Sequence, residues 1–233
     1  MNFGKLYRGS RKLAAKTLPK PALKLIKKVY SFPVVGMGGS LITNERIEVN
    51  LSLLERCSEL EGDVIECGVY RGGNLIELAK KLKSIESNKV VYGLDTFEGL
   101  PFNSEEDEVA GKQMLPTGLF EDTSVESIQH LLDKKGLGNV KLIKGLFSES
   151  FLSLKDKKFC FAYIDADLYL SIKQCIDFLK PRMVKGGVIM FDDYNSPTCG
   201  GANKAVEEGL GKENLFIFPN KRCYWVKSQH LNI

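Results

Sequence analysis

The sequence predicts an α/β fold built around a mostly parallel sheet. Hydrophobic runs of strand length alternate along the chain with segments whose apolar residues recur at helical spacing. Two of these runs end in acidic pairs, FCFAYIDAD at Asp165 and Asp167, and GVIMFDD at Asp192 and Asp193. A length of 233 residues with 43% hydrophobic composition fits one domain with a substantial core.

Charge is distributed unevenly along the chain. Residues 1–44 carry nine Lys and Arg and no acid, and the remainder holds 24 bases against 29 acids. This basic arm has two interpretations. Residues 1–30 could contact an anionic surface such as a membrane leaflet, or they could form a solvated or oligomer-contacting extension. We expect no nucleic-acid partner, because no aromatic–basic interleaving accompanies the charge. We divide the chain into a basic arm with a lid, 1–42, and a main domain, 43–233.

Cysteine usage and hydropathy indicate the compartment. Six scattered cysteines without a C-x-x-C pair favour reduced thiols. No apolar run approaches the ~18 residues of a membrane span, and Lys16, Pro19 and Lys20 interrupt the apolar positions near the start. We expect a cytoplasmic protein that forms a homo-oligomer, with peripheral membrane contact available through the basic arm.

A βαβ unit follows the first predicted helix, which begins after Thr43 or Asn44. Its strands are residues 63–69 and 90–96, joined by the turn RGGN at 71–74 and a helix. That helix has apolar residues at i, i+3, i+4 and i+7: Leu75, Leu78, Ala79 and Leu82. A glycine-rich turn at a helix start lets backbone amides approach an anionic group, and an acid such as Asp95 at the next strand end accepts ribose hydroxyls. The unit therefore predicts a nucleotide-type cofactor site, although E-C-G-V-Y-R-G-G-N differs from the dinucleotide fingerprint.

The rest of the chain continues the alternation. Residues 98–123 are polar, acidic and too long for an ordinary connection, which predicts either a substrate-facing loop or a disordered insertion. Thr123 and Glu126 predict a capping box that opens a helix. Later elements are expected at these positions: strand 140–145, the run ending at Asp165, helix 169–180, the run ending at Asp192, and a closing hairpin of 215–219 with 223–228.

Acidic side chains at the ends of neighbouring parallel strands converge on one edge of the sheet. Asp165, Asp167, Asp192 and Asp193 would repel each other there unless a cation lay between them. Magnesium prefers oxygen ligands of this kind. The sequence therefore predicts a divalent metal site at this edge.

Four motifs in order, GDVIECGVYRGGN, YGLDTFEGLP, YIDADLY and GGVIMFDDY, resemble the macrocin O-methyltransferase family over about residues 35–228. Members of that family are S-adenosylmethionine- and magnesium-dependent sugar O-methyltransferases of antibiotic and glycan biosynthesis. The resemblance implies a Rossmann-like class I methyltransferase domain, with a seven-stranded, mostly parallel sheet and an antiparallel last strand.

The resemblance also implies roles for individual residues. It implies that S-adenosylmethionine is held by Glu66, Gly68, Tyr70, Arg71, Gly72, Gly73, Asn74, Asp95, Thr96, Gly145, Phe147 and Asp165. It implies that magnesium is held by Asp165, Asp192 and Asp193. Arg71 has a second interpretation, as a partner of the acidic segment 98–123.

We expect the general base to be a carboxylate. Related catechol-type enzymes carry a lysine three residues after the first metal-binding aspartate, where this chain has Leu168. His130 is expected on an outer helix face and His230 in the tail. These positions leave Asp165 as ligand and base, with Asp167 next; Asp167 has the alternative role of capping the helix at 169–180.

We expect O-methylation of a sugar in a glycoside, nucleotide sugar or glycan. A vicinal diol chelated by the metal would lose a proton more easily, and the oxygen would then attack the sulfonium methyl. The alternatives are a catechol- or phenol-type O-methyltransferase, a glycosyltransferase using Asp165-x-Asp167 as its metal motif, and a non-catalytic adaptor that binds surfaces through its basic arm.

Overall fold

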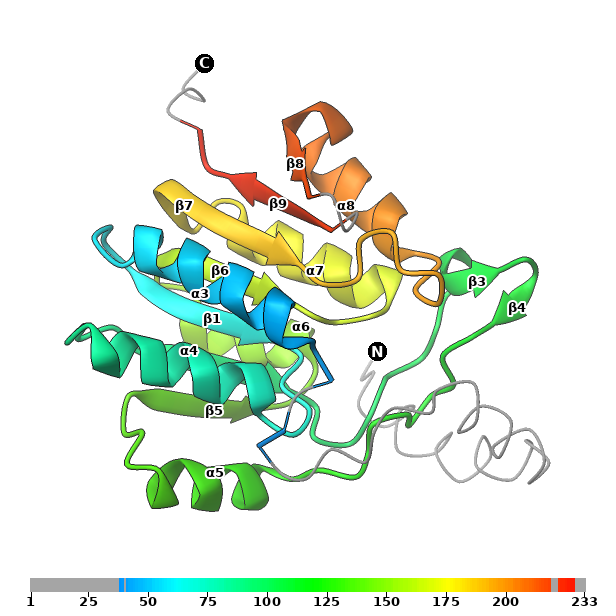
Figure 1. Cartoon of the computed structure of the whole chain (residues 1–233). Helices are drawn as coiled ribbons and strands as arrows, with labels where there is room; N and C mark the ends of the chain where they lie inside the picture. Colours follow the sequence, from blue (N-terminus) through cyan, green and yellow to red (C-terminus); the bar gives the residue numbers. More distant parts are fainter. Residues whose placement is uncertain (1–37, 40, 219–221, 229–233) are drawn as a thin grey trace. The chain divides into compact units, whose positions relative to one another are not determined.

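A seven-stranded sheet forms the centre of this computed structural model, which describes residues 38–39, 41–218 and 222–228 (Figure 1). The strand order is β5-β2-β1-β6-β7-β9-β8. The first five strands in this order run parallel, β9 is antiparallel to β7, and β8 is antiparallel to β9. The strands are β1 (Asp63–Cys67), β2 (Val91–Asp95), β5 (Val140–Lys144), β6 (Phe159–Ile164), β7 (Met183–Phe191), β8 (Leu215–Ile217) and β9 (Cys223–Val226). The predicted fold class and the closing hairpin are confirmed.

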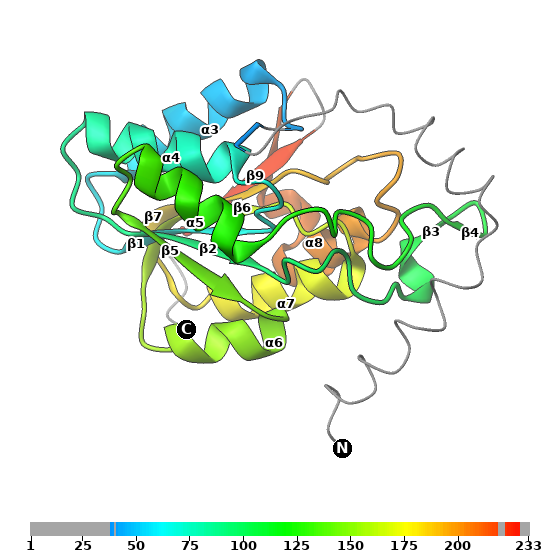
Figure 2. The same ribbon diagram turned by 90° about the horizontal axis from the view of Figure 1, so that it is seen from below.

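Helices cover both faces of the sheet (Figure 2). One face carries α3 (Asn44–Cys57), α4 (Gly73–Ser84) and α5 (Val125–Lys134), and the other carries α6 (Phe147–Ser150), α7 (Tyr169–Leu179) and α8 (Ala202–Leu210). Short 3-10 turns occur at Glu105–Asp107, Phe151–Leu154 and Lys212–Asn214. This layered arrangement leaves the carboxyl ends of the parallel strands at one edge of the sheet.

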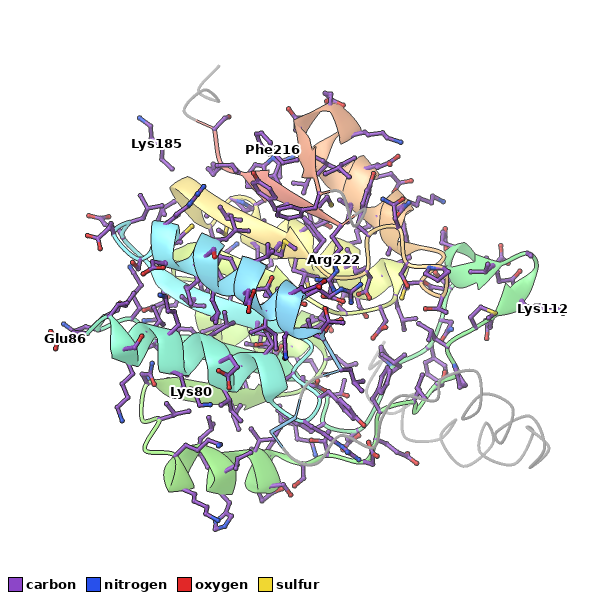
Figure 3. All side chains as sticks on the ribbon, viewed as in Figure 1. Lys80, Glu86, Lys112, Lys185, Phe216 and Arg222 are labelled. Atoms are coloured by element: carbon purple, nitrogen blue, oxygen red, sulfur yellow. The ribbon has the colours of Figure 1, made fainter. Side chains whose placement is uncertain are left out.

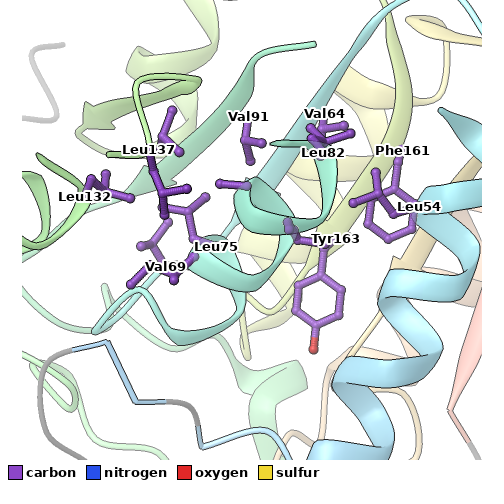
Figure 4. Close-up of a cluster of buried hydrophobic side chains, with 14 of the residues drawn as sticks. Leu54, Val64, Val69, Leu75, Leu82, Val91, Leu132, Leu137, Phe161 and Tyr163 are labelled. Atoms are coloured by element: carbon purple, nitrogen blue, oxygen red, sulfur yellow. The ribbon is translucent and has the colours of Figure 1, made fainter. Parts of the chain in front are cut away.

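Apolar side chains of α3, α4 and α5 pack on the sheet and form a core (Figure 4). The central strand β6 is buried along its whole length, as expected for a parallel strand covered on both faces. The core includes Leu54, Leu75, Leu78, Leu82, Ile128 and Leu132 from the helices, with Val64, Val91 and Phe161 from the strands. Tyr163 belongs to the same cluster, with its hydroxyl at the end away from the labelled apolar side chains.

The acidic insertion, residues 98–123, contains short elements of its own. A 3-10 turn leads into a two-stranded ribbon, β3 (Glu108–Val109) and β4 (Lys112–Gln113). The predicted Thr123 capping box is wrong. Ser124 caps α5, where its Oγ accepts the Ser127 N–H at 3.1 Å, because the Thr123 hydroxyl donates instead to the Tyr70 carbonyl at 2.6 Å.

Three further predictions concern the cysteines, membrane-spanning helices and the N-terminal basic arm. All six cysteines are buried with free thiols. In the described residues no helix is long and apolar enough to cross a membrane. The basic arm 1–30 and most of the predicted lid 31–42 lie outside the described residues, so the anionic-surface prediction stays a prediction, as does the homo-oligomer.

Candidate active site

The glycine turn after β1 packs directly on the backbone of Asp165. Gly68 has φ +91°, and a Cβ at this position would lie 1.7 Å from the Asp165 carbonyl oxygen. The Asp165 N–H donates to the Cys67 carbonyl at 2.9 Å, which holds the two segments together. Only glycine fits at position 68. Two motifs nearly a hundred residues apart in the sequence therefore meet at one point.

Asp95 at the end of β2 shapes the same turn. Its Oδ2 accepts the backbone N–H groups of Val69 at 2.8 Å and Tyr70 at 2.9 Å, and its Oδ1 accepts the Phe97 N–H at 2.8 Å. The Thr96 Oγ1 also lies 3.3 Å from Oδ1, but its single proton has a shorter contact with the Gly99 carbonyl. A carboxylate has about four acceptor positions, so Asp95 retains capacity for a ligand hydroxyl. The Thr96 hydroxyl donates to the Gly99 carbonyl at 2.7 Å and organises the following turn.

Glu66 lies buried under the turn, beside the start of α4. Its side chain is 2% exposed, and its Oε2 has no hydrogen-bond partner among the described residues. Burial raises its pKa well above the ordinary value of 4.5. Nearby, the Asn50 amide on α3 donates to Asn74 Oδ1 at 3.1 Å. An unpaired buried acceptor costs roughly 1–3 kcal/mol, so this position fits a donor group of a ligand, such as the ammonium of an amino-acid moiety.

Arg71 pairs with the insertion. Its Nη2 lies 2.6 Å from Asp122 Oδ2, and its guanidinium lies 5.2 Å from the centre of the Tyr70 ring. The Tyr70 ring in turn meets Phe120 edge to face at 5.1 Å. This ion pair confirms the interpretation in which Arg71 pairs with the acidic segment, and its contact with a cofactor stays a prediction.

Gly72, Gly73 and Asn74 form the junction of the turn with α4. Gly72 adopts φ +80° as the N-cap, and α4 begins at Gly73. On the other side of Asp95, the Gly145 N–H donates to the Asp95 carbonyl at 2.9 Å, and Phe147 begins α6. The residues predicted to hold the two ends of a nucleotide-type cofactor therefore flank β1 and β2 at the same edge.

The predicted metal ligands converge. Asp165, Asp192 and Asp193 each offer an oxygen, and these oxygens lie within 4.8 Å of one another. Burial, and then the charges of Asp193 and Asp167, raise the pKa of Asp165 well above its ordinary value. Burial and the Asp167 charge raise the pKa of Asp193 to about 7. An oxygen-only donor set with unfavourable mutual repulsion fits a divalent cation such as magnesium.

Asp192 has partners that sequence reasoning missed. Tyr163 donates its hydroxyl to Oδ1, the Arg222 guanidinium pairs with the same oxygen, and Arg46 Nη1 lies 3.3 Å from Oδ2. Figure 3 shows Arg222 in the interior of the domain, in contrast to Lys112 at the tip of the ribbon. One signal was available for Tyr163, because it lies next to the end of β6 and Asp192 directly follows the end of the paired strand β7. No sequence pattern pointed to Arg46 or Arg222.

Asp167 joins the two acidic segments and does not cap α7. Its N–H donates to Asp193 Oδ2 at 2.9 Å, and Asp167, Asp193 and Cys199 form a second group of potential ligands within 4.8 Å. The first N–H of α7, from Tyr169, donates to Asp107 of the insertion at 2.6 Å. The capping interpretation of Asp167 is wrong because a residue distant in sequence takes that role. His130 is exposed on α5, as predicted, and His230 lies outside the described residues.

The sheet order, the glycine turn on β1 and the acidic end of β2 define a class I methyltransferase fold. A family model described as Macrocin-O-methyltransferase (TylF) matches residues 20–215. The chain belongs to this family and is an O-methyltransferase, which removes the glycosyltransferase and adaptor alternatives.

Three comparisons describe its similarity to known proteins. A mycinamicin III 3''-O-methyltransferase of Micromonospora griseorubida is 26% identical over 192 residues, covering 76% of each chain. The 8-demethyl-8-(2,3-dimethoxy-alpha-L-rhamnosyl)-tetracenomycin-C 4'-O-methyltransferase of Streptomyces olivaceus is 28% identical over 149 residues, covering 60% of this chain and 56% of the relative. The crystal structure of the calicheamicin methyltransferase CalS11 superimposes with a TM-score of 0.68 at 22% identity, covering 96% of this chain and 91% of that one, which supports the fold.

Proposed function

We propose that the protein transfers the methyl group of S-adenosylmethionine to a hydroxyl of a sugar in a glycoside, nucleotide sugar or glycan, with magnesium held by Asp165, Asp192 and Asp193. The observation that carries the proposal is the packing of the glycine turn at Gly68 on the Asp165 backbone. This contact joins a cofactor-type turn to an edge lined with carboxylates. The name of the Streptomyces olivaceus relative includes a rhamnosyl group, which supports a sugar acceptor.

The turn and its neighbours would hold the cofactor. Glu66 has a buried oxygen without a hydrogen-bond partner in the described part of the chain, which could accept from the ammonium of the methionine moiety. Asp95 has spare acceptor capacity for the ribose hydroxyls. Gly145 and Phe147 lie beyond Asp95 and would border the adenine. These groups would orient the cofactor at the edge where the carboxylates lie.

The acidic edge would position the acceptor and take its proton. Magnesium, when bound, supplies positive charge that lowers the pKa of a coordinated hydroxyl. Asp165 is the proposed proton acceptor, because it lies on the side of the edge that touches the glycine turn. Asp167 is the next candidate, since its N–H contact with Asp193 keeps it beside the ligand group. Positioning of the reacting atoms would lower the activation free energy by several kcal/mol.

The proposal is tested by measuring S-adenosylhomocysteine release with a panel of methyl glycosides, nucleotide sugars and oligosaccharides, and with catechol as the rival acceptor. We expect turnover with a sugar, its loss on removal of divalent ions with EDTA, and its recovery when excess magnesium is returned. Undiminished turnover in EDTA would exclude the metal from the mechanism. Preferential methylation of catechol would favour the phenol-type alternative.

A further inference from the structure

We propose that Asp107, in the acidic insertion, is a positioning residue for the metal site. It fixes the segment after β6 against the segment after β7, and these two segments carry the ligands Asp165, Asp192 and Asp193. This inference rests on the proposed magnesium site and extends it to the acidic insertion, whose sequence predicted only a substrate-facing loop or a disordered insertion.

Asp107 is a buried carboxylate with both oxygens engaged. The residue is 4% exposed. Oδ1 accepts the backbone N–H of Tyr169 at 2.6 Å, at the start of α7. Oδ2 accepts the N–H of Ser104 at 2.8 Å and its hydroxyl at 2.9 Å. The carboxylate thus connects the insertion to the residue that lies just after Asp165 and Asp167.

The segment after β7 packs against the same carboxylate. A Cβ on Gly201 would lie 2.5 Å from Tyr169 Cβ and 2.6 Å from Asp107 Oδ1. A Cβ on Gly200 would lie 2.7 Å from the Glu108 carbonyl oxygen of the insertion. The insertion, the start of α7 and residues 200–201 therefore meet without space for any side chain at the two glycines.

The two ligand-bearing segments are also bonded to each other. The Asp167 N–H donates to Asp193 Oδ2 at 2.9 Å. Only three residues separate Tyr169 from Asp165, so a shift at Tyr169 is not easily absorbed before it reaches Asp165. On the other segment, the Sγ of Cys199, the residue before Gly200, lies 3.4 Å from Asp193 Oδ1. Movement at the Asp107 contact should therefore reach the carboxylate oxygens that would hold the ion.

A purely structural role makes a different prediction. A carboxylate that only caps α7 would contribute to the stability of the fold and leave ion affinity unchanged. A positioning role changes ion affinity, because supporting residues around metal ligands typically contribute about 10–100-fold. Ion affinity therefore separates the two roles.

The experiment uses Mn²⁺ as a spectroscopic probe of the full-length chain without turnover. Free Mn²⁺ is measured by electron paramagnetic resonance, and S-adenosylhomocysteine affinity by calorimetry. We expect Asp107→Ala to weaken Mn²⁺ binding about tenfold, with S-adenosylhomocysteine affinity within about twofold of the wild type. Asp107→Asn retains an acceptor for the Tyr169 N–H and should weaken Mn²⁺ binding less. The control is Glu105→Gln, an exposed acid of the same insertion, which should change neither affinity.

Gly201→Ala disturbs the contact from the other segment and should also weaken Mn²⁺ binding. Wild-type Mn²⁺ affinity in folded Asp107→Ala and Asp107→Asn chains would overturn the positioning role while leaving the metal site standing. A wild-type chain that binds S-adenosylhomocysteine but no Mn²⁺ would overturn the metal assignment itself, and the inference with it.

Discussion

Asp192 carries more interactions than a metal ligand requires. Tyr163, Arg46 and Arg222 all contact its carboxylate, and Arg222 is 1% exposed. Removing one partner of a buried ion pair typically costs roughly 3–5 kcal/mol, because the other charge remains buried. Loss of activity in Asp192→Ala would therefore mix instability with loss of a ligand. Asp192→Asn keeps the volume and a hydrogen-bond acceptor, and is the cleaner test.

Glu66 offers a prediction in which stability and binding change in opposite directions. Its folded-state pKa is raised by burial, so its contribution to stability is full below the ordinary pKa of 4.5 and is lost as pH rises through the raised value. Glu66→Gln removes that loss, so its stability relative to the wild type should be higher at pH 7 than at pH 5. It should also bind S-adenosylhomocysteine about tenfold more weakly, since a charge-assisted hydrogen bond to the ligand is lost.

Urea unfolding at pH 5 and pH 7 and calorimetry with S-adenosylhomocysteine measure these two effects. Glu59→Gln, an exposed acid shortly before β1, is the matched control and should leave both quantities unchanged. Undiminished affinity in Glu66→Gln would mean that Glu66 is a structural acid and does not contact the cofactor.

At the scale of elements, the insertion connects the two halves of the site. Its C-terminal end binds the glycine turn through the Arg71–Asp122 pair and the Thr123 hydrogen bond to Tyr70. Its 3-10 turn, Glu105–Asp107, contacts the start of α7 through Asp107. The cofactor-side turn and the metal-side segments are thus contacted by the same stretch of chain. Asp122 is 60% exposed, so its ion pair contributes at most about 1 kcal/mol.

The contact between the glycine turn and β6 gives a prediction at the same scale. Gly68→Ala should destabilise the fold by about 3 kcal/mol or more, because the new Cβ would meet the Asp165 backbone oxygen and the residue has a left-handed φ. Gly138→Ala is the control, since a Cβ there meets nothing within 4 Å, and it should change stability by less than about 1 kcal/mol. Urea unfolding compares the two, and equal stabilities would contradict the close approach.

At the scale of the whole molecule, ligands of the site should stabilise the fold. S-adenosylhomocysteine at about 100 times its Kd should contribute about 2.7 kcal/mol, which for a chain of this size raises Tm by roughly 5–10 °C. Magnesium should add a further increase in the wild type. In Asp192→Asn the cofactor shift should remain and the magnesium shift should disappear, as measured by calorimetric melting with each ligand alone and together. A magnesium shift of wild-type size in that variant would remove Asp192 from the ligand set.

Much of the site was predictable because it depends on local patterns. Gly68, Asp95, Asp165, Asp192 and Asp193 follow from strands that end in glycine or acid, and parallel pairing brings strand ends to one edge. The errors have a common cause. Thr123 and Asp167 are plausible caps in the sequence, but their polar groups bond to distant residues in the folded chain.

The strands of the large sheet, the helices α3, α4, α5 and α7, and the acids at the strand ends were predictable from the sequence, because hydrophobic periodicity is a property of short segments. The ribbon β3–β4 and helix α8 were not predicted. Three contacts follow from the packing of the whole chain: Asp107 caps α7, Arg71 binds Asp122, and Tyr163 contacts Asp192. These contacts join residues between 29 and 62 positions apart. The partner of a buried polar group is set by which donors the packed chain brings within about 3 Å, and no local pattern encodes that distance.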